Sequence, residues 1–222
     1  MFNPRLEILP PAQRSLWNDL GVIPRTFVLY GGTALALRLG HRQSIDFDFF
    51  TNESFEPAVL LSQIEFLRDG RVDQRGNNTL TAVVDRGGEV KISFFGGVNM
   101  NRVNDPDVIS DPRVRIASLL DLTATKLKTI QQRAEAKDYL DVFAAIEHGI
   151  ALPAALSAAA AIYGRTFNAI AALKALSYFA DGDLPLLNAD VKRRLREAVQ
   201  GVGLNSLPEA QAMPGILGQQ FS

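Results

Sequence analysis

Short apolar stretches alternate with polar breaks through the first half of the chain, and they predict a mixture of strands and helices. A continuous apolar run at residues 27–30 is bounded by glycine, which indicates a buried strand. Polar and aromatic positions alternate over residues 44–50, as in a half-buried strand. Two further runs flank an Asp-Arg-Gly-Gly turn and predict a hairpin, at residues 79–84 and 89–95. Helices are expected at residues 12–19, 34–39 and 57–68. The first half is therefore predicted to be an α+β unit built on a small sheet.

Helical periodicity replaces this pattern from about residue 114 onward. The breaks at glycine and proline delimit five helices, at residues 117–133, 136–147, 153–163, 168–179 and 190–199. The segment 104–112 is rich in Asn, Asp and Pro and is the expected linker. We therefore expect a domain at residues 1–110 and a helical domain at residues 111–222.

The residues with candidate chemistry lie within residues 30–50, from the end of the first predicted strand through the second. Gly31-Gly32 precedes a short apolar helix, and Asp46 and Asp48 follow it. Side chains at i and i+2 of a strand share a face, so the two carboxylates are expected to project together while Ile45, Phe47 and Phe49 pack on the other side. Such a pair suits Mg²⁺ carried with a triphosphate, and glycines at a helix N-terminus suit a phosphate. The competing interpretation is an ordinary turn followed by a solvated strand face.

The composition excludes several classes of protein and agrees with the elements predicted above. With 222 residues, 47% of them hydrophobic, the chain can bury a substantial core, and its net charge of −1 gives no overall attraction to nucleic acid or membrane. The absence of cysteine excludes disulfides, thiol catalysis and cysteine zinc sites. No apolar run approaches the roughly 20 residues of a membrane helix, and the start of the chain has no signal-peptide pattern. A cytoplasmic protein without a membrane partner is expected.

The stretch at residues 30–50, YGGTALALRLGHRQSIDFDFF, resembles motif I of nucleotidyltransferases with the polymerase-beta-type fold. More narrowly it resembles the AbiEii/AbiGii toxins of abortive-infection toxin–antitoxin systems, and the likeness continues at residues 90–95, 119–130 and 136–146. This resemblance implies an α+β fold with a small mixed sheet and flanking helices, followed by a helical domain that closes a cleft. It also implies transfer of a nucleoside monophosphate from an NTP to an acceptor with Mg²⁺ or Mn²⁺. RNA is the implied acceptor or target, and a separately encoded antitoxin is the implied partner.

The resemblance assigns roles to residues of the first half. Asp46 and Asp48 match the metal-binding, catalytic pair, and Gly31 with Gly32 matches the phosphate turn. Thr33 is expected to cap the helix and to offer its hydroxyl to a phosphate. Arg42 and Ser44, which match the family's Arg-x-Ser pattern, are further nucleotide-binding candidates. An equally weighted alternative is that Arg42 only braces the carboxylates through an ion pair.

The helical half carries further candidates by the same resemblance. Lys126 matches the lysine of the third motif and is expected to stabilise charge on the leaving group, and Lys137 is a nucleotide-binding candidate. Asp138, in the same motif as Asp141, is the candidate for orienting or deprotonating the acceptor. The alternative is a surface helix with intrahelical ion pairs.

One departure from the superfamily pattern qualifies the catalytic interpretation. Polymerase-beta-type enzymes usually carry a third carboxylate on a following strand, where this chain has Ser93. Lys91 lies two residues earlier and can help to neutralise phosphate charge, or it is simply a solvated strand lysine. The alternative function is therefore a catalytically impaired NTP-binding protein of the same fold. A metal-free interaction module is a third hypothesis.

Overall fold

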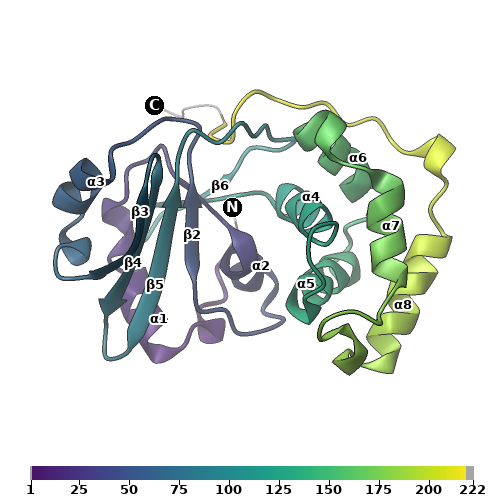
Figure 1. Ribbon diagram of the computed structural model, residues 1–222, viewed down its shortest axis with the longest axis horizontal. Helices are drawn as coiled ribbons and strands as arrows, with labels where there is room; N and C mark the ends of the chain where they lie inside the picture. Colours follow the sequence, from purple (N-terminus) through teal and green to yellow (C-terminus); the bar gives the residue numbers. More distant parts are fainter. Residues whose placement is uncertain (1, 219–222) are drawn as a thin grey trace. The chain divides into compact units, whose positions relative to one another are not determined.

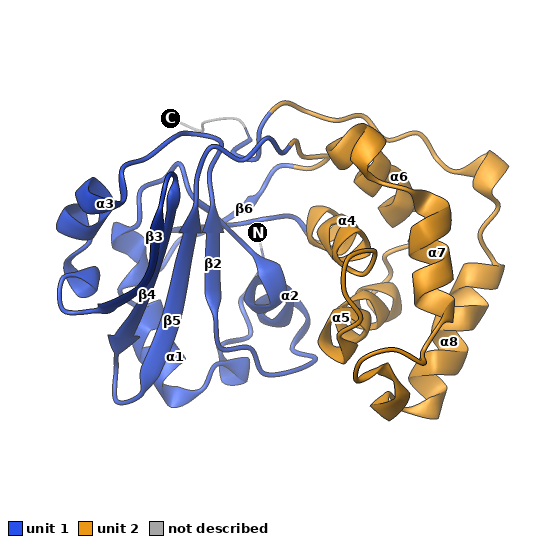
Figure 2. Cartoon of the chain, viewed as in Figure 1, with its two compact units in different colours: residues 1–100, 105–118, 215–222 blue, residues 101–104, 119–214 orange. Residues whose placement is uncertain are grey.

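The computed structural model describes residues 2–218, and the chain forms two compact units. The first comprises residues 1–100, 105–118 and 215–222, and the second comprises residues 101–104 and 119–214 (Figure 2). The first unit contains all the strands of the described chain, and the second is helical (Figure 1).

The first unit is built on a seven-stranded mixed sheet with the strand order β3-β4-β5-β2-β1-β7-β6. Its strands are β1 (Val28–Tyr30), β2 (Phe47–Phe50), β3 (Arg71–Gly76), β4 (Thr79–Asp85), β5 (Glu89–Phe95), β6 (Asp107–Ile109) and β7 (Val114–Ile116). Strand β2 pairs antiparallel with β1 and parallel with β5, and β1 pairs parallel with β7. The predicted strands and the β4–β5 hairpin are confirmed.

Alternation along β2 separates the core of the sheet from its polar face. Phe47 and Phe49 are 0% and 1% exposed, and the Phe49 ring stacks on Phe94 of β5 with centroids 5.6 Å apart. Asp48, between the two phenylalanines, lies on the opposite face because neighbouring strand residues alternate. Ile45 is 55% exposed, so the prediction that it packs with the phenylalanines was wrong. The reason is that β2 begins only at Phe47.

Three α-helices and several short 3₁₀ turns complete the first unit. The α-helices are α1 (Pro11–Trp17), α2 (Gly31–Leu39) and α3 (Pro57–Gln63). Helix α2 ends at Gly40, whose φ of +67° places it in the left-handed region that commonly terminates helices. The expected helix at residues 57–68 is divided between α3 and the 3₁₀ turn η3 (Glu65–Leu67).

The second unit is a bundle of the five predicted helices. They are α4 (Leu119–Thr129), α5 (Ala136–Glu147), α6 (Leu152–Tyr163), α7 (Ala169–Ser177) and α8 (Ala189–Gln200). Small buried residues on α6, such as Ala155 and Ala159, let a neighbouring helix approach closely. The hydroxyl of Tyr163 donates to Thr125 Oγ1 at 3.1 Å and joins α6 to α4.

Two segments differ from the prediction. The expected linker at residues 104–112 contains β6, which pairs with β7, so the first unit continues to Ser118 instead of ending at residue 110. Strand β3 was not predicted, because all six of its residues are exposed and it therefore lacks the alternation of a half-buried strand. Strands of three residues, such as β6 and β7, are too short to show a period.

No helix in residues 2–218 is both long enough and apolar enough to cross a membrane.

Candidate active site

The Gly-Gly step at the junction of β1 and α2 lies against charged side chains that follow it in the sequence. Gly31 has a φ of +76°, in the left-handed region that favours glycine. A Cβ atom at Gly31 would lie 2.8 Å from Asp48 Oδ2, and a Cβ atom at Gly32 would collide with the Arg42 guanidinium. The absence of both Cβ atoms therefore lets the backbone approach these two groups, and the structure brings Gly31, Gly32, Arg42 and Asp48 together.

The N-terminus of α2 offers backbone donors at the same place. The helix begins at Gly31, and in the described chain its N-cap residue, Tyr30, makes no side-chain capping hydrogen bond. The first N–H groups of a helix have no partner within the helix and carry the positive end of its dipole. Such a terminus binds phosphate or carboxylate groups readily. Thr33 lies inside the helix, so the prediction that it is the cap was wrong.

Thr33 instead fixes the loop that leads to β2. Its side chain is 1% exposed, and its Oγ1 lies 2.7 Å from Ser44 Oγ. The same hydroxyl donates to the backbone carbonyl of Asp46. These bonds hold Ser44 and Asp46 against the first turn of α2, so both hydroxyls serve the position of the loop in this structure.

The two aspartates differ in how they are fixed. Asp48 is within β2, where its backbone is paired on both sides, with Tyr30 of β1 and Ser93 of β5. Asp46 precedes the first residue of β2, and its carbonyl is held by Thr33. Both aspartates are half-buried. Strand alternation therefore orients Asp48, whereas Asp46 depends on the loop.

Ser93, where the resemblance led us to expect a third carboxylate, is paired with Asp48 in the sheet. Parallel partners in a sheet present their side chains to the same face, so Ser93 is the direct neighbour of Asp48. Ser93 is 3% exposed, and its Oγ accepts a hydrogen bond of 3.2 Å from Thr81 Oγ1 of β4. No group of three or more His, Asp or Glu side chains that could hold a metal ion occurs in residues 2–218.

The donor set nevertheless suits one kind of cation. Mg²⁺ is usually held in proteins by one or two carboxylates together with water and substrate phosphates. Asp48 supplies a carboxylate beside a glycine whose missing Cβ leaves space at Oδ2. The residues present thus fit Mg²⁺ or Mn²⁺ that arrives with a triphosphate better than a cation held by protein ligands alone.

Two candidates of the second unit, Lys126 on α4 and Asp138 on α5, belong to a buried cluster of charged side chains. Lys126 Nζ lies 2.6 Å from Asp138 Oδ1 and 2.7 Å from Asp141 Oδ2, and both aspartates are 0% exposed. Arg133 Nε donates to Asp138 Oδ2 at 2.7 Å. Buried Lys126 is thus shared by two buried aspartates, and Arg133, whose side chain is 44% exposed, supplies the second positive charge from the edge of the cluster, which lowers the cost of burying the carboxylates.

The protonation of Asp138 is set by this cluster. Burial alone would raise the pKa of its carboxyl, but the bonds and charges of Arg133 and Lys126 outweigh burial and hold that pKa below its usual value. The bond to Asp138 likewise raises the pKa of Arg133. A carboxylate with a lowered pKa and both oxygens engaged is a weak proton acceptor.

The two remaining lysine candidates are exposed. Lys91 is on β5, two residues before Ser93, and Lys137 forms an ion pair of 2.8 Å with Glu135. The sequence did not predict that Asp141 would pair with Lys126, or that Arg133 would pair with Asp138. The only signal available was their spacing, with Asp141 three residues after Asp138 and Arg133 five residues before it.

Comparison with known proteins links this arrangement to one family. The family described as "Nucleotidyl transferase AbiEii toxin, Type IV TA system" matches residues 23–212. An uncharacterized protein of Aquifex aeolicus (strain VF5) is 36% identical over 126 residues, which are 55% of this chain. The match spans 59% of that relative's length, less than two thirds.

Two solved structures share the fold. A candidate nucleotidyltransferase from H. pylori has a TM-score of 0.54 at 18% identity, covering 84% of this chain and 89% of its own. MenT4, a nucleotidyltransferase toxin from Mycobacterium tuberculosis H37Rv, has a TM-score of 0.61 at 16% identity, covering 87% of this chain and 83% of its own. At these identities the likeness shows a common fold, and the predicted fold class is confirmed.

Proposed function

Because the chain belongs to the AbiEii family of nucleotidyltransferase toxins, we propose that it transfers a nucleoside monophosphate from an NTP to an acceptor and releases pyrophosphate. The observation that carries this proposal is the approach of Gly31 to Asp48. A carboxylate attracts cations, whereas the N-terminus of a helix attracts anions. A triphosphate bound with a divalent cation satisfies both at once.

Different residues of the sheet unit bind different parts of this complex of triphosphate and divalent cation. The backbone of Gly31 and Gly32 holds a phosphate at the start of α2, and the Arg42 guanidinium, which lies beside Gly32, adds positive charge. Asp46 and Asp48 hold the cation side of the complex. Mg²⁺ or Mn²⁺, when bound there, neutralises charge on the triphosphate. Phosphoryl transfer depends mainly on such positioning and charge neutralisation.

Thr33 and Ser44 act on the site through the loop that they fix. Their hydroxyls bond to each other and to the Asp46 carbonyl, so their contribution is the position of Asp46. Lys91 is exposed on the strand that carries Ser93, and it supplies positive charge to the polar face of the sheet.

In the helical unit, ion pairs with Asp138 and Asp141 fix the orientation of the Lys126 side chain. An ammonium group has three donors, and two of them face Asp138 and Asp141. The third is the one that can stabilise charge on the pyrophosphate leaving group. Asp138 orients Lys126 and Arg133, since its lowered pKa makes it unsuited to removing a proton from the acceptor. Lys137, which is exposed, is the further nucleotide contact from this unit.

The acceptor and partner follow from the family assignment. We propose RNA as the acceptor and a cognate antitoxin as the protein that neutralises the toxin. A net charge of −1 gives no general affinity for RNA, so recognition depends on local groups.

The test is nucleotide transfer with labelled substrates. The full chain is incubated with each labelled NTP, total RNA and Mg²⁺ or Mn²⁺, in parallel with Asp48→Ala. We expect label in RNA with the wild-type protein and none with the variant. Label that persists in Asp48→Ala contradicts the assignment of the site.

A second candidate function rests on Ser93, the hydroxyl beside Asp48. If catalysis is impaired, the wild-type protein binds NTP tightly and transfers no label with either metal. If the domain is an interaction module, Mg²⁺ with NTP gives no thermal shift, whereas a ligand at 100 times its Kd stabilises by about 2.7 kcal/mol.

A further inference from the structure

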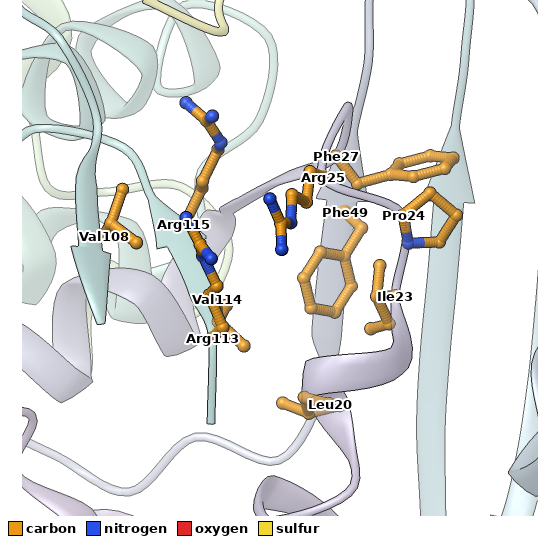
Figure 3. Close-up of a pocket in the computed structure, with 10 residues that line it drawn as sticks. All are labelled: Leu20, Ile23, Pro24, Arg25, Phe27, Phe49, Val108, Arg113, Val114 and Arg115. Atoms are coloured by element: carbon orange, nitrogen blue, oxygen red, sulfur yellow. The ribbon is translucent and has the colours of Figure 1, made fainter. Parts of the chain in front are cut away.

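A narrow hollow of about 40 Å³ opens in the first unit, away from the candidate active site. One wall comes from the segment between the 3₁₀ turn η2 (Leu20–Val22) and β1, and the other comes from β6 and β7. In Figure 3, Ile23 and Phe49 lie on one side and Val108 and Val114 on the other, with Arg25 reaching between them. The hollow thus joins segments about 90 residues apart in the sequence.

The volume of the hollow limits what can enter it. Pockets for small molecules and cofactors usually enclose about 300 to 1,000 Å³, and one water occupies about 30 Å³ in the liquid. A space of about 40 Å³ therefore excludes a nucleotide or a nucleobase. Because its floor is apolar, with Phe49 1% and Ile23 6% exposed, the fitting occupant is the end of one aliphatic side chain.

Three arginines surround this apolar floor. Arg25 and Arg113 are exposed and Arg115 is half-buried, and the lining contains no acidic residue. Arg115 Nη1 donates to the carbonyl of Leu217 at 2.9 Å. Across residues 2–218, none of these three guanidinium groups forms an ion pair.

The arginines of helix α8 provide a contrast. Arg193 pairs with Asp190 and Glu197, and Arg194 pairs with Glu147 at 2.5 Å. Those charges are already neutralised within the fold. The arginines around the hollow instead leave a local excess of positive charge, which attracts an anionic partner.

We propose that this hollow is the docking point for a partner protein that presents one aliphatic side chain flanked by acidic residues. Arginine is enriched at protein interfaces, where its planar fork pairs with carboxylates in two-point bonds. Burial of one aliphatic side chain adds about 1.5 to 3 kcal/mol to such a contact.

Single-stranded RNA is the less suitable occupant of the same surface. Bases bind such surfaces by stacking on exposed aromatic side chains. The two aromatic residues that line the hollow, Phe27 and Phe49, are only 4% and 1% exposed. The surface therefore offers charge to a phosphate chain but no stacking platform.

Docking at this hollow leaves the candidate active site uncovered. Phe49 follows Asp48 in β2, and successive strand residues point to opposite faces. The proposed partner thus contacts the face opposite to Asp48, and NTP binding is expected to continue while the partner is bound. The proposal goes beyond the nucleotidyltransferase function and does not depend on it.

The test uses two labelled acidic peptides that differ at one position, Glu-Asp-Glu-Leu-Asp-Glu-Asp and the same peptide with Ala for Leu. Fluorescence anisotropy with the full chain at low salt is expected to show binding of the Leu peptide at least about tenfold tighter than the Ala peptide. Arg25→Glu and Arg113→Glu are each expected to weaken the Leu peptide about tenfold or more. Arg75→Glu, at an exposed arginine of β3 outside the hollow, is the matched control and is expected to change little.

A variant that fills the hollow separates the apolar contribution from the charge. Val108→Phe keeps all three arginines and is expected to make the two peptides bind equally. Equal binding of both peptides to the wild-type protein, or no saturable binding of the Leu peptide, overturns the proposal. Oligouridine RNA that binds through Arg25 and Arg113 more tightly than the Leu peptide also overturns it, in favour of an RNA surface. NTP-induced thermal shifts of the same variants report on the nucleotide site separately.

Discussion

The sheet unit and the helical unit both carry aspartates of the family motifs, but they hold them in opposite physical states. In the sheet unit, Asp48 is half-buried and lies beside a glycine backbone and a helix N-terminus. In the helical unit, Asp138 and Asp141 are fully buried and share Lys126. The first arrangement gains from an added ligand, whereas the second is already balanced within the protein. Removal of a charge should therefore affect binding in one unit and stability in the other.

The largest expected effect is the loss of the buried cluster in Asp138→Ala. Asp138 accepts hydrogen bonds from Lys126 and Arg133, and a hydrogen bond to a charged group contributes about 1.5 to 3 kcal/mol, so the variant is expected to lose about 3 kcal/mol. Lys126 and Arg133 would both lose a partner. Chemical denaturation followed by circular dichroism measures the change.

Glu197→Ala is the matched control, because Glu197 forms an ion pair of 2.7 Å with Arg193 where both side chains are more than half exposed. A pair of this kind is worth about 0 to 1 kcal/mol. Equal destabilisation by the two variants would show that the cluster around Lys126 is not the stabilising feature of the helical unit.

Gly31→Ala should produce a smaller loss of stability together with a loss of NTP binding. A non-glycine residue in the left-handed region costs about 1 to 2 kcal/mol, and the new Cβ would press on Asp48 Oδ2. We expect a decrease of about tenfold or more in NTP affinity, measured by isothermal titration calorimetry.

Gly87 offers the control for backbone strain. Its φ is +77°, close to that of Gly31, but a Cβ there would meet nothing within 4 Å. Gly87→Ala should lower stability by a similar amount and leave NTP affinity unchanged. An equal loss of affinity in both variants would separate Gly31 from the binding site.

Ser93→Asp adds the carboxylate that the superfamily pattern has beside Asp48. Like charges at paired positions of a sheet are destabilising, by about 1 kcal/mol or less at exposed sites and by more where they are buried. We expect a lower melting temperature without divalent cations and recovery of most of that loss when Mg²⁺ is added. Ser93→Asn adds similar volume without charge and should show no such recovery, and the same melting curve for both variants would contradict the interpretation.

The effect that is smallest near neutral pH, where it vanishes, concerns Tyr139, buried in α5 with its hydroxyl donating to the Ala175 carbonyl at 3.2 Å. Burial raises its pKa to about 12. Since the folded pKa exceeds the unfolded value of about 10, its contribution to stability is complete below pH about 10 and is lost as the pH rises toward about 12. Ultraviolet difference absorbance should show a tyrosine ionisation step near pH 12 that is absent in Tyr139→Phe. A step near pH 12 that persists unchanged in Tyr139→Phe would contradict the assignment.

The sequence predicted the elements with clear periodicity and missed those without it. The helices of the second unit and the β4–β5 hairpin follow from patterns several residues long. Strand β3 is exposed throughout, so it shows no alternation. Strands β6 and β7 have three residues each and include a charged one, whereas three-residue β1 lies in a continuous apolar run that could be recognised. The boundary between the units was displaced for the same reason.

The candidate site shows a similar division. The approach of Gly31 to Asp48 was anticipated, because a glycine turn, a short helix and a strand form one local unit. The partners of Asp138 were not, because the ion pairs of a buried cluster depend on how α4 and α5 pack. The grouping of arginines around the hollow could not be predicted either, because Arg25 and Arg113 are far apart in the sequence and line the same hollow only once the sheet has formed.

The measurement that tests the central claim most directly is a crystal structure with Mn²⁺ and a non-hydrolysable NTP analogue. The account predicts an anomalous manganese peak in contact with the Asp48 carboxylate, with the triphosphate against the backbone of Gly31 and Gly32. Asp48→Asn crystals should lose the manganese peak. A triphosphate bound elsewhere, or manganese bound without contact to Asp48, would contradict the account.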